Sequence, residues 1–195
     1  MGLTYLLHLV QASISWETRL HPFAKAGNFV LKSGGTHQTA RSWMIESNKL
    51  AEFAKHPELA LQNINELLSL LDSDDEAELN TASDLLENCG APSRADIPFL
   101  CDQLKSGRSS TVYWCSTLLG RLGATVGEQG ERSRIDTELC RAICDESLEL
   151  SARERAAWAI GQLGKVEGDG RASLEKHVEK APARLKRLLE TALAT

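Results

Sequence analysis

The stretch RERAAWAIGQLG at residues 153–164 has the apolar spacing of one helix face and ends in glycine. Similar endings occur twice earlier in the chain, as WCSTLLGRLG at 114–123 and as TASDLLENCG at 81–90. The final glycines are 33 and 41 residues apart. Self-similarity at intervals of this length is typical of helical repeat proteins. The sequence therefore predicts a repeated helix as the unit of the fold.

Aligning the three copies on the final glycine produces five columns of apolar or small residues. They lie at offsets of 0, 1, 3, 4 and 7, the spacing of the apolar stripe of an α-helix. The columns are Ala82/Cys115/Ala156, Ser83/Ser116/Ala157, Leu85/Leu118/Ala159, Leu86/Leu119/Ile160 and Cys89/Leu122/Leu163. Because the first columns hold small residues, we expect a neighbouring helix to approach closely there.

Glycines occur at two kinds of position in these copies. Gly90 and Gly123 follow the apolar stripe, where a left-handed C-terminal cap is expected. Gly120 and Gly161 lie one turn inside the helix, where glycine costs about 1 kcal/mol relative to alanine. We therefore expect a packing reason at both, most simply a close crossing of two backbones.

Further helices are predicted between and after the copies. Apolar residues three and four apart occur at 63–73, 95–107, 135–147 and 171–180. The last segment, 181–194, resembles a degenerate fourth copy. Serine followed three residues later by glutamate predicts capping boxes at Ser73–Glu76 and Ser151–Glu154. The glycine-rich stretch 123–134 is predicted to be a long loop, and it is the first place where a functional insertion is expected.

Helix pairs recurring at this interval resemble HEAT repeats, and RERAAWAIGQLG is similar to the short variety named after phycobilisome lyases. The resemblance covers about residues 58–194. It implies an all-α fold, an α-α superhelix or HEAT/ARM-like solenoid of about four helical pairs. The same fold is expected physically, since one helix pair cannot bury its apolar face alone.

The first 43 residues differ in charge from the rest of the chain. They carry one acidic and four basic residues, a net charge of +3, whereas residues 44–195 carry 26 acidic and 18 basic residues, a net charge of −8. Segment 1–43 also lacks a sustained helical period. We interpret it as a flexible tail, a stretch that precedes the true start codon, or a targeting segment. Residues 44–195 are interpreted as the repeat domain.

The composition argues against several classes of protein. The longest apolar stretch is far shorter than the roughly 20 residues that a membrane-spanning helix needs. Five cysteines without a CxxC pair favour a reducing, cytoplasmic setting over a disulfide framework. A net charge of −5 makes nucleic acid an unlikely partner, because phosphate binding needs clustered lysine and arginine.

No pattern in the chain predicts catalysis. Cys140 and Cys144, four residues apart, could both bind a metal, but without a second ligand pair they are interpreted as core residues. Trp114 and Trp158 are interpreted as packing residues, although HEAT-like DNA glycosylases use aromatic residues in their substrate site. We predict no cofactor and no metal.

The leading hypothesis is a non-catalytic scaffold that binds a protein partner through a concave face. In HEAT arrays the second helix type lines that face, so the resemblance implies contacts from the intervening helices. The candidate residues are Asp102, Gln103, Lys105, Glu138, Arg141, Asp145, Glu175 and Lys176. The alternatives are a phycobilisome-lyase-like enzyme or enzyme subunit that handles a bilin and, less favoured, a DNA-repair protein.

Overall fold

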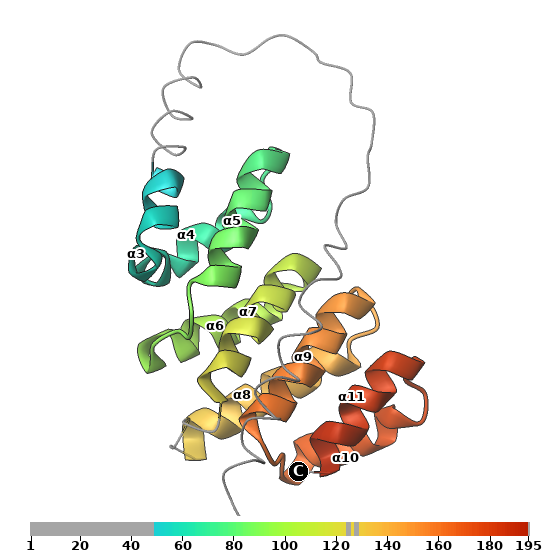
Figure 1. The fold of residues 1–195 in the computed structure, drawn as a ribbon. Coiled ribbons are helices and arrows are strands. Elements are labelled where there is room, and N and C mark those ends of the chain that lie inside the picture. Colours follow the sequence, from blue (N-terminus) through green and yellow to red (C-terminus); the bar gives the residue numbers. More distant parts are fainter. Residues whose placement is uncertain (1–48, 124–125, 127–128, 195) are drawn as a thin grey trace, which may run out of the picture. The chain divides into compact units, whose positions relative to one another are not determined.

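The computed structural model describes residues 49–123, 126 and 129–194. All regular structure among them is helical, and these residues contain no strand. Residues 49–55 are helical, and the helices that follow (Figure 1) are α3 (Pro57–Gln62), α4 (Ile64–Leu70), α5 (Glu76–Asn88), η1 (Arg94–Asp96), α6 (Ile97–Gln103), η2 (Leu104–Ser106), α7 (Ser109–Leu122), α8 (Gln129–Cys144), α9 (Leu150–Leu163), α10 (Gly168–Val178) and α11 (Ala183–Ala194). The predicted all-α class is confirmed for this part of the chain. Segment 1–43 lies outside it.

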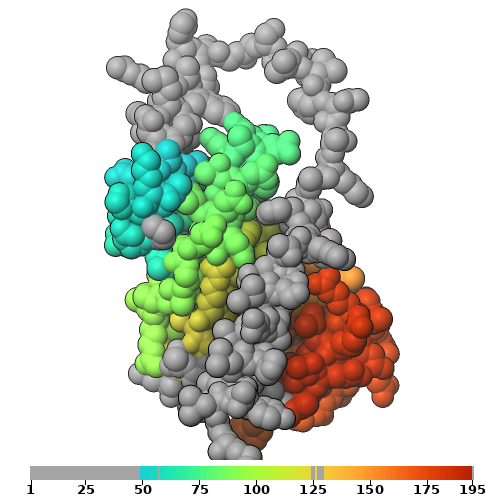
Figure 2. All heavy atoms as spheres, viewed as in Figure 1, coloured from blue at the N-terminus to red at the C-terminus, as the bar shows by residue number. Residues whose placement is uncertain are grey.

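The helices pack in two rows. α7 packs on α9, and α9 packs on α11, which we call the repeat-helix row (Figure 1). α6 with η2 contacts α8, and α8 contacts α10, which we call the intervening-helix row. Each intervening helix also packs on the repeat helix that follows it, and α4 packs on α5 in the same way. In the space-filling view the colours follow the chain order from α3 to α11 (Figure 2).

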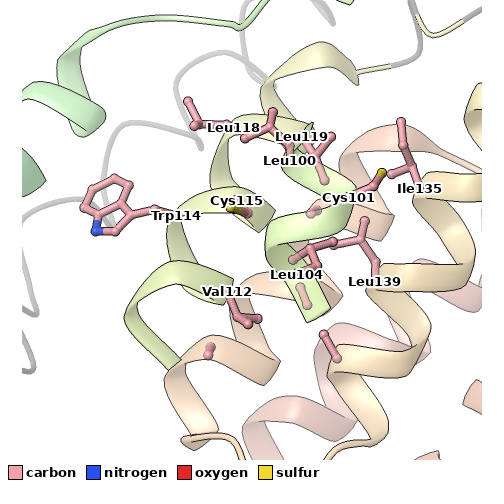
Figure 3. Packing of buried hydrophobic residues seen from close by; sticks show 14 of the residues in the cluster. Leu100, Cys101, Leu104, Val112, Trp114, Cys115, Leu118, Leu119, Ile135 and Leu139 are labelled. Atoms are coloured by element: carbon pink, nitrogen blue, oxygen red, sulfur yellow. The ribbon is translucent and has the colours of Figure 1, made fainter. Parts of the chain in front are cut away.

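The core lies between the two rows. Figure 3 shows one part of it, formed by Leu100, Cys101 and Leu104 with Val112, Cys115, Leu118, Leu119, Ile135 and Leu139. Every residue of the five aligned columns is buried except Ser83, which is half-buried. The helical period therefore predicted the buried face correctly, because residues three and four apart lie on one side of an α-helix.

The two glycines inside the repeat helices differ in their surroundings. A Cβ added at Gly120 would lie 2.6 Å from Cζ3 of Trp158 and 3.1 Å from Cα of Ala159. The close approach expected at Gly120 is confirmed. A Cβ at Gly161 would meet no atom within 4 Å, so the same expectation is wrong there. The reason is that α9 places Trp158 and Ala159 beside Gly120, whereas no residue of α11 lies close to Gly161.

At the helix ends, the glycines predicted after the repeat helices have positive φ angles, but the predicted capping boxes are absent. Gly90 and Gly123 have positive φ angles of 85° and 58°, as expected of glycine caps. Gly123 pairs this φ with a ψ of −156°, so its conformation is not left-handed α. Asp75, not Ser73, caps α5 by accepting from the N–H of Ala77.

The capping box predicted at Ser151–Glu154 is also wrong. The chain enters α9 two residues earlier, with Glu149 at the N-cap. Ser151 is thus inside the helix, and Glu154 pairs with Arg184 of α11. A capping box that was not predicted joins Ser93 and Asp96 at η1. The hydroxyl of Ser73 instead donates to Glu78 and accepts from the N–H of Asp75.

The predicted loop 123–134 is shorter than expected. α8 begins at Gln129, so the second half of the glycine-rich stretch is helical. Residues 124–125 and 127–128 lie outside the described residues. A short connection also joins α9, which ends at Leu163, to α10, which begins at Gly168. None of the helices in the described ranges has the length and apolar character needed to cross a membrane.

Arginines from neighbouring helices cap several helix ends. The last carbonyl groups of a helix lack partners within it and carry partial negative charge that attracts cations. The pairs are Arg121 with Leu86, Glu87 and Gly90 after α5, Arg132 with Leu163, Gly164 and Lys165 after α9, Arg141 with Leu104 in η2, Arg153 with Ile143 in α8, and Arg171 with Leu193 in α11. These contacts join α7 to α5, α8 to η2 and α9, and α10 to α11.

Candidate functional site

The structure brings four of the predicted contact residues together on α6, η2 and α8. The Nζ of Lys105 lies 3.0 Å from Oδ1 of Asp102 and 3.3 Å from Oε1 of Glu138. The Nε of Arg141 lies 3.0 Å from Oε2 of Glu138. Arg134, which was not predicted, pairs with Asp102 at 3.0 Å. We call these five residues the α6–α8 charge network.

Hydrogen bonds stabilise the charged forms within this network. The hydrogen bond from Lys105 holds the pKa of Asp102 below its usual value, and Arg134 acts in the same direction. The hydrogen bond to Asp102 and the one to Glu138 raise the pKa of Lys105. Because each charge already has a partner in the chain, a ligand that used one of them would have to replace an existing ion pair.

The remaining predicted residues are not part of this network. Gln103 is half-buried at the end of α6. Asp145, just after α8, accepts hydrogen bonds from the N–H and the hydroxyl of Ser147, and these bonds lower its pKa. Glu175 pairs with Arg171 within α10, and its neighbour Lys176 is exposed.

A second cluster of side chains spans α7 and α9. The guanidinium carbon of Arg155 lies 4.5 Å from the ring centroid of Tyr113 and 5.1 Å from the indole of Trp158. Arg155 also donates a hydrogen bond to the hydroxyl of Tyr113. Trp114 meets Tyr113 edge to face, with centroids 5.3 Å apart. We call these four residues the aromatic–arginine cluster.

This cluster belongs to the repeat-helix row, where Trp114 is buried in the core and Tyr113 and Trp158 pack against the core residues. Trp114 projects from α7 on the side opposite Val112 (Figure 3). Tyr113, Arg155 and Trp158 are half-buried. Both tryptophans were predicted to be packing residues, and no role was predicted for Tyr113 or Arg155. A signal for Arg155 was present, since the aligned copies place it in the column of Trp114.

A polar cavity of about 620 Å³ lies between α8 and the start of α10. Arg132 and Asp136 line it and pair with each other at 2.9 Å. Burial raises the pKa of Asp136, while the hydrogen bond from Arg132 opposes that shift. Arg132 is also bound to the carbonyls after α9, so its contacts are structural.

The cysteines are reduced and lie mostly in the core. Cys140 is buried and Cys144 half-buried, as the core interpretation expects. Burial raises the pKa of Cys101 to about 11 and that of Cys140 to about 12. Within the described ranges, no three His, Cys, Asp or Glu side chains are grouped so that they could hold a metal ion.

No family model matches the chain, and no curated protein or solved structure is significantly similar to it.

Proposed function

We propose that the protein is a HEAT-like helical-repeat module that binds a protein partner and performs no chemistry of its own. Two observations support a stacked, solenoid-type arrangement. The aligned columns of the repeat helices are buried, and each helix row is joined by contacts between successive helices. In such folds the surface made by one row of helices serves as an extended binding face.

The aromatic–arginine cluster carries the proposal. Tyrosine, tryptophan and arginine are the residue types enriched among those that contribute most binding energy at protein interfaces. Tyr113 and Trp158 each combine an apolar ring with a polar group, and Arg155 is held between them at 4.5 and 5.1 Å from the ring centroids. A side chain ordered before binding loses little conformational entropy on association.

Helix packing favours the repeat-helix row as the inner face of the proposed solenoid. When two rows of helices curve together, the row with the closer helices lies on the inside. Contacts along the repeat-helix row, α7 with α9 and α9 with α11, are more extensive than contacts along the intervening-helix row. We therefore place the partner on the repeat-helix row. Binding through the intervening helices and the eight residues named from the sequence stays a prediction.

One experiment distinguishes the two faces. The full chain is used to capture and crosslink interacting proteins, beside the variant Tyr113→Ser/Arg155→Gln. The matched control is Asp102→Asn/Lys105→Gln, which removes two charges from the α6–α8 charge network. Circular dichroism and the thermal midpoint check that each variant is folded.

We expect proteins captured by the wild type to be lost with the cluster variant and kept with the network variant. Loss with the network variant alone would overturn the placement and favour the intervening helices. Retention of the chain on DNA at low salt, abolished by Arg155→Gln, would assign the same face to nucleic acid instead.

A further inference from the structure

Two adjacent charged residues of α9 are buried. Arg153 is 8% exposed and Glu154 is 9% exposed. A buried charge is costly unless it is paired or hydrogen-bonded. Glu154 pairs with Nε of Arg184 on α11 at 3.2 Å. Arg153 points to the other side and joins α9 to α8 and α10.

The contact between Arg153 and His177 defines the charge of the histidine. The Nε of Arg153 donates to the carbonyl of Ile143 at 2.9 Å, and its Nη2 lies 2.8 Å from Nε2 of His177. A guanidinium carries only donors and stays charged. Nε2 of His177 must therefore accept, which requires a neutral ring with its proton on Nδ1.

The surroundings of His177 oppose its protonation. Burial of the ring is the largest cause that lowers its pKa, and the charge of Arg153 is the second. Lys180, just after α10, acts in the same direction, while Glu146, in the connection after α8, acts against it. A protonated ring would lose its acceptor atom and would place two cations within hydrogen-bond distance.

We propose that His177 is a proton-sensitive contact between α9 and α10, so that its protonation breaks the bond from Arg153 and lets α10 open locally while α11 stays packed on α9. α10 packs against α8 and α11. The hydrogen bond between Arg153 and His177 connects α10 to α9. α11, in contrast, has its own packing against α9 together with the Glu154 pair.

The pH window follows from the direction of the shift. The pKa of His177 in the folded protein is below its ordinary value of 6.5. At pH values between the folded-state pKa and 6.5, the form with α10 closed therefore binds fewer protons at His177 than the form with α10 open. The contribution of His177 is complete above pH 6.5 and is lost as the pH falls through the folded-state pKa. Each pKa unit of difference changes the opening equilibrium by about tenfold.

Glu154 titrates with the opposite effect. Burial raises its pKa, and the charge of Arg184 opposes that shift. A raised carboxyl pKa means that the folded form binds the proton more readily, so acidification does not weaken α11 through Glu154. The response is therefore expected in α10 and not in α11.

Hydrogen exchange of the full chain at pH 7.5 and pH 5.5, corrected for intrinsic exchange rates, tests the proposal. His177→Gln keeps a neutral acceptor at every pH, and His56→Gln is the matched control, because His56 is an exposed histidine far along the chain. We expect at least severalfold faster opening of α10 at pH 5.5 in the wild type and in His56→Gln, with no change in α11. In His177→Gln we expect no pH response.

A pH response that persists in His177→Gln, or one that spreads equally over all helices, would overturn the proposal. If α10 of His177→Gln is open at both pH values, the tautomer and pKa of His177 in the wild type are measured by NMR to test the proposal. An Nδ1–H tautomer that titrates below 6.5 supports the proposal, and a pKa of 6.5 or above overturns it.

Discussion

The ring of Trp158 on α9 lies directly against α7 at Gly120, where an added Cβ would be 2.6 Å from Cζ3 of the ring. The same helical position in the next copy, Gly161, has no atom within 4 Å of its added Cβ. Two glycines that look equivalent in the aligned sequence thus have opposite packing. Trp158 therefore links the aromatic–arginine cluster to the packing of the repeat-helix row.

Alanine at these two glycines should change stability in opposite directions. Gly120→Ala forces the indole of Trp158 to move, and overpacking of this kind costs about 1–3 kcal/mol. Gly161→Ala has open space and gains helix propensity, up to about 1 kcal/mol. Urea unfolding of both variants measures the difference. A smaller cost of Gly120→Ala when Trp158 is also changed to Phe would assign the clash to the ring.

Arg121→Met should loosen the end of α5. The guanidinium of Arg121 donates to the carbonyls of Leu86 and Glu87 at 2.7 Å, and hydrogen bonds from charged groups contribute about 1.5–3 kcal/mol. We expect a loss of about that size in the free energy of unfolding and faster hydrogen exchange in α5. Arg187→Met, at an exposed position of α11, is the control. Equal effects of the two variants would contradict the capping role.

Gly164→Ala should destabilise the protein although it adds no contact. Gly164 has φ 91° and ψ −157° after α9, a region that only glycine adopts at low cost, and such strain costs about 1–3 kcal/mol. Gly130→Ala is the control, since Gly130 lies in α8 with no atom within 4 Å of an added Cβ. A lower thermal midpoint is expected only for Gly164→Ala. An unchanged midpoint would argue against this backbone conformation.

The buried thiols should react slowly in the folded protein. The raised pKa values of Cys101 and Cys140, about 11 and 12, keep both as neutral thiols at pH 8, and the thiolate is the reactive form. We expect half-buried Cys144 to be alkylated first and the other two only as the protein unfolds. Mass spectrometry of labelled peptides over time measures the order. Rapid labelling of Cys101 would contradict its burial.

The repeat helices were predictable because their signal is local. The five columns recur at helical spacing, and a helix that must bury one face shows that face in its sequence. The capping boxes at Ser73 and Ser151 were not predictable with the same success. Asp75 competes with Ser73 for the start of α5, α9 begins before Ser151, and Glu154 pairs with Arg184 of another helix.

Only part of the candidate site could be predicted. Asp102, Lys105, Glu138 and Arg141 were named together, and they meet because α6 and α8 are neighbours in the intervening-helix row. Tyr113 and Arg155 were missed, because 42 residues separate them in the chain. Their contact depends on how α9 is placed on α7, which no pattern within either helix specifies.

From the sequence alone one can derive the helices, their buried faces and the absence of a recognisable catalytic motif, since each depends on residues a few positions apart. The tertiary structure alone decided that Gly120 receives a tryptophan while Gly161 does not, that arginines cap the ends of other helices, and that Arg153 meets His177. These contacts join residues that are distant in the chain. Their geometry depends on the placement of whole helices against one another, which the packing of all the side chains determines together.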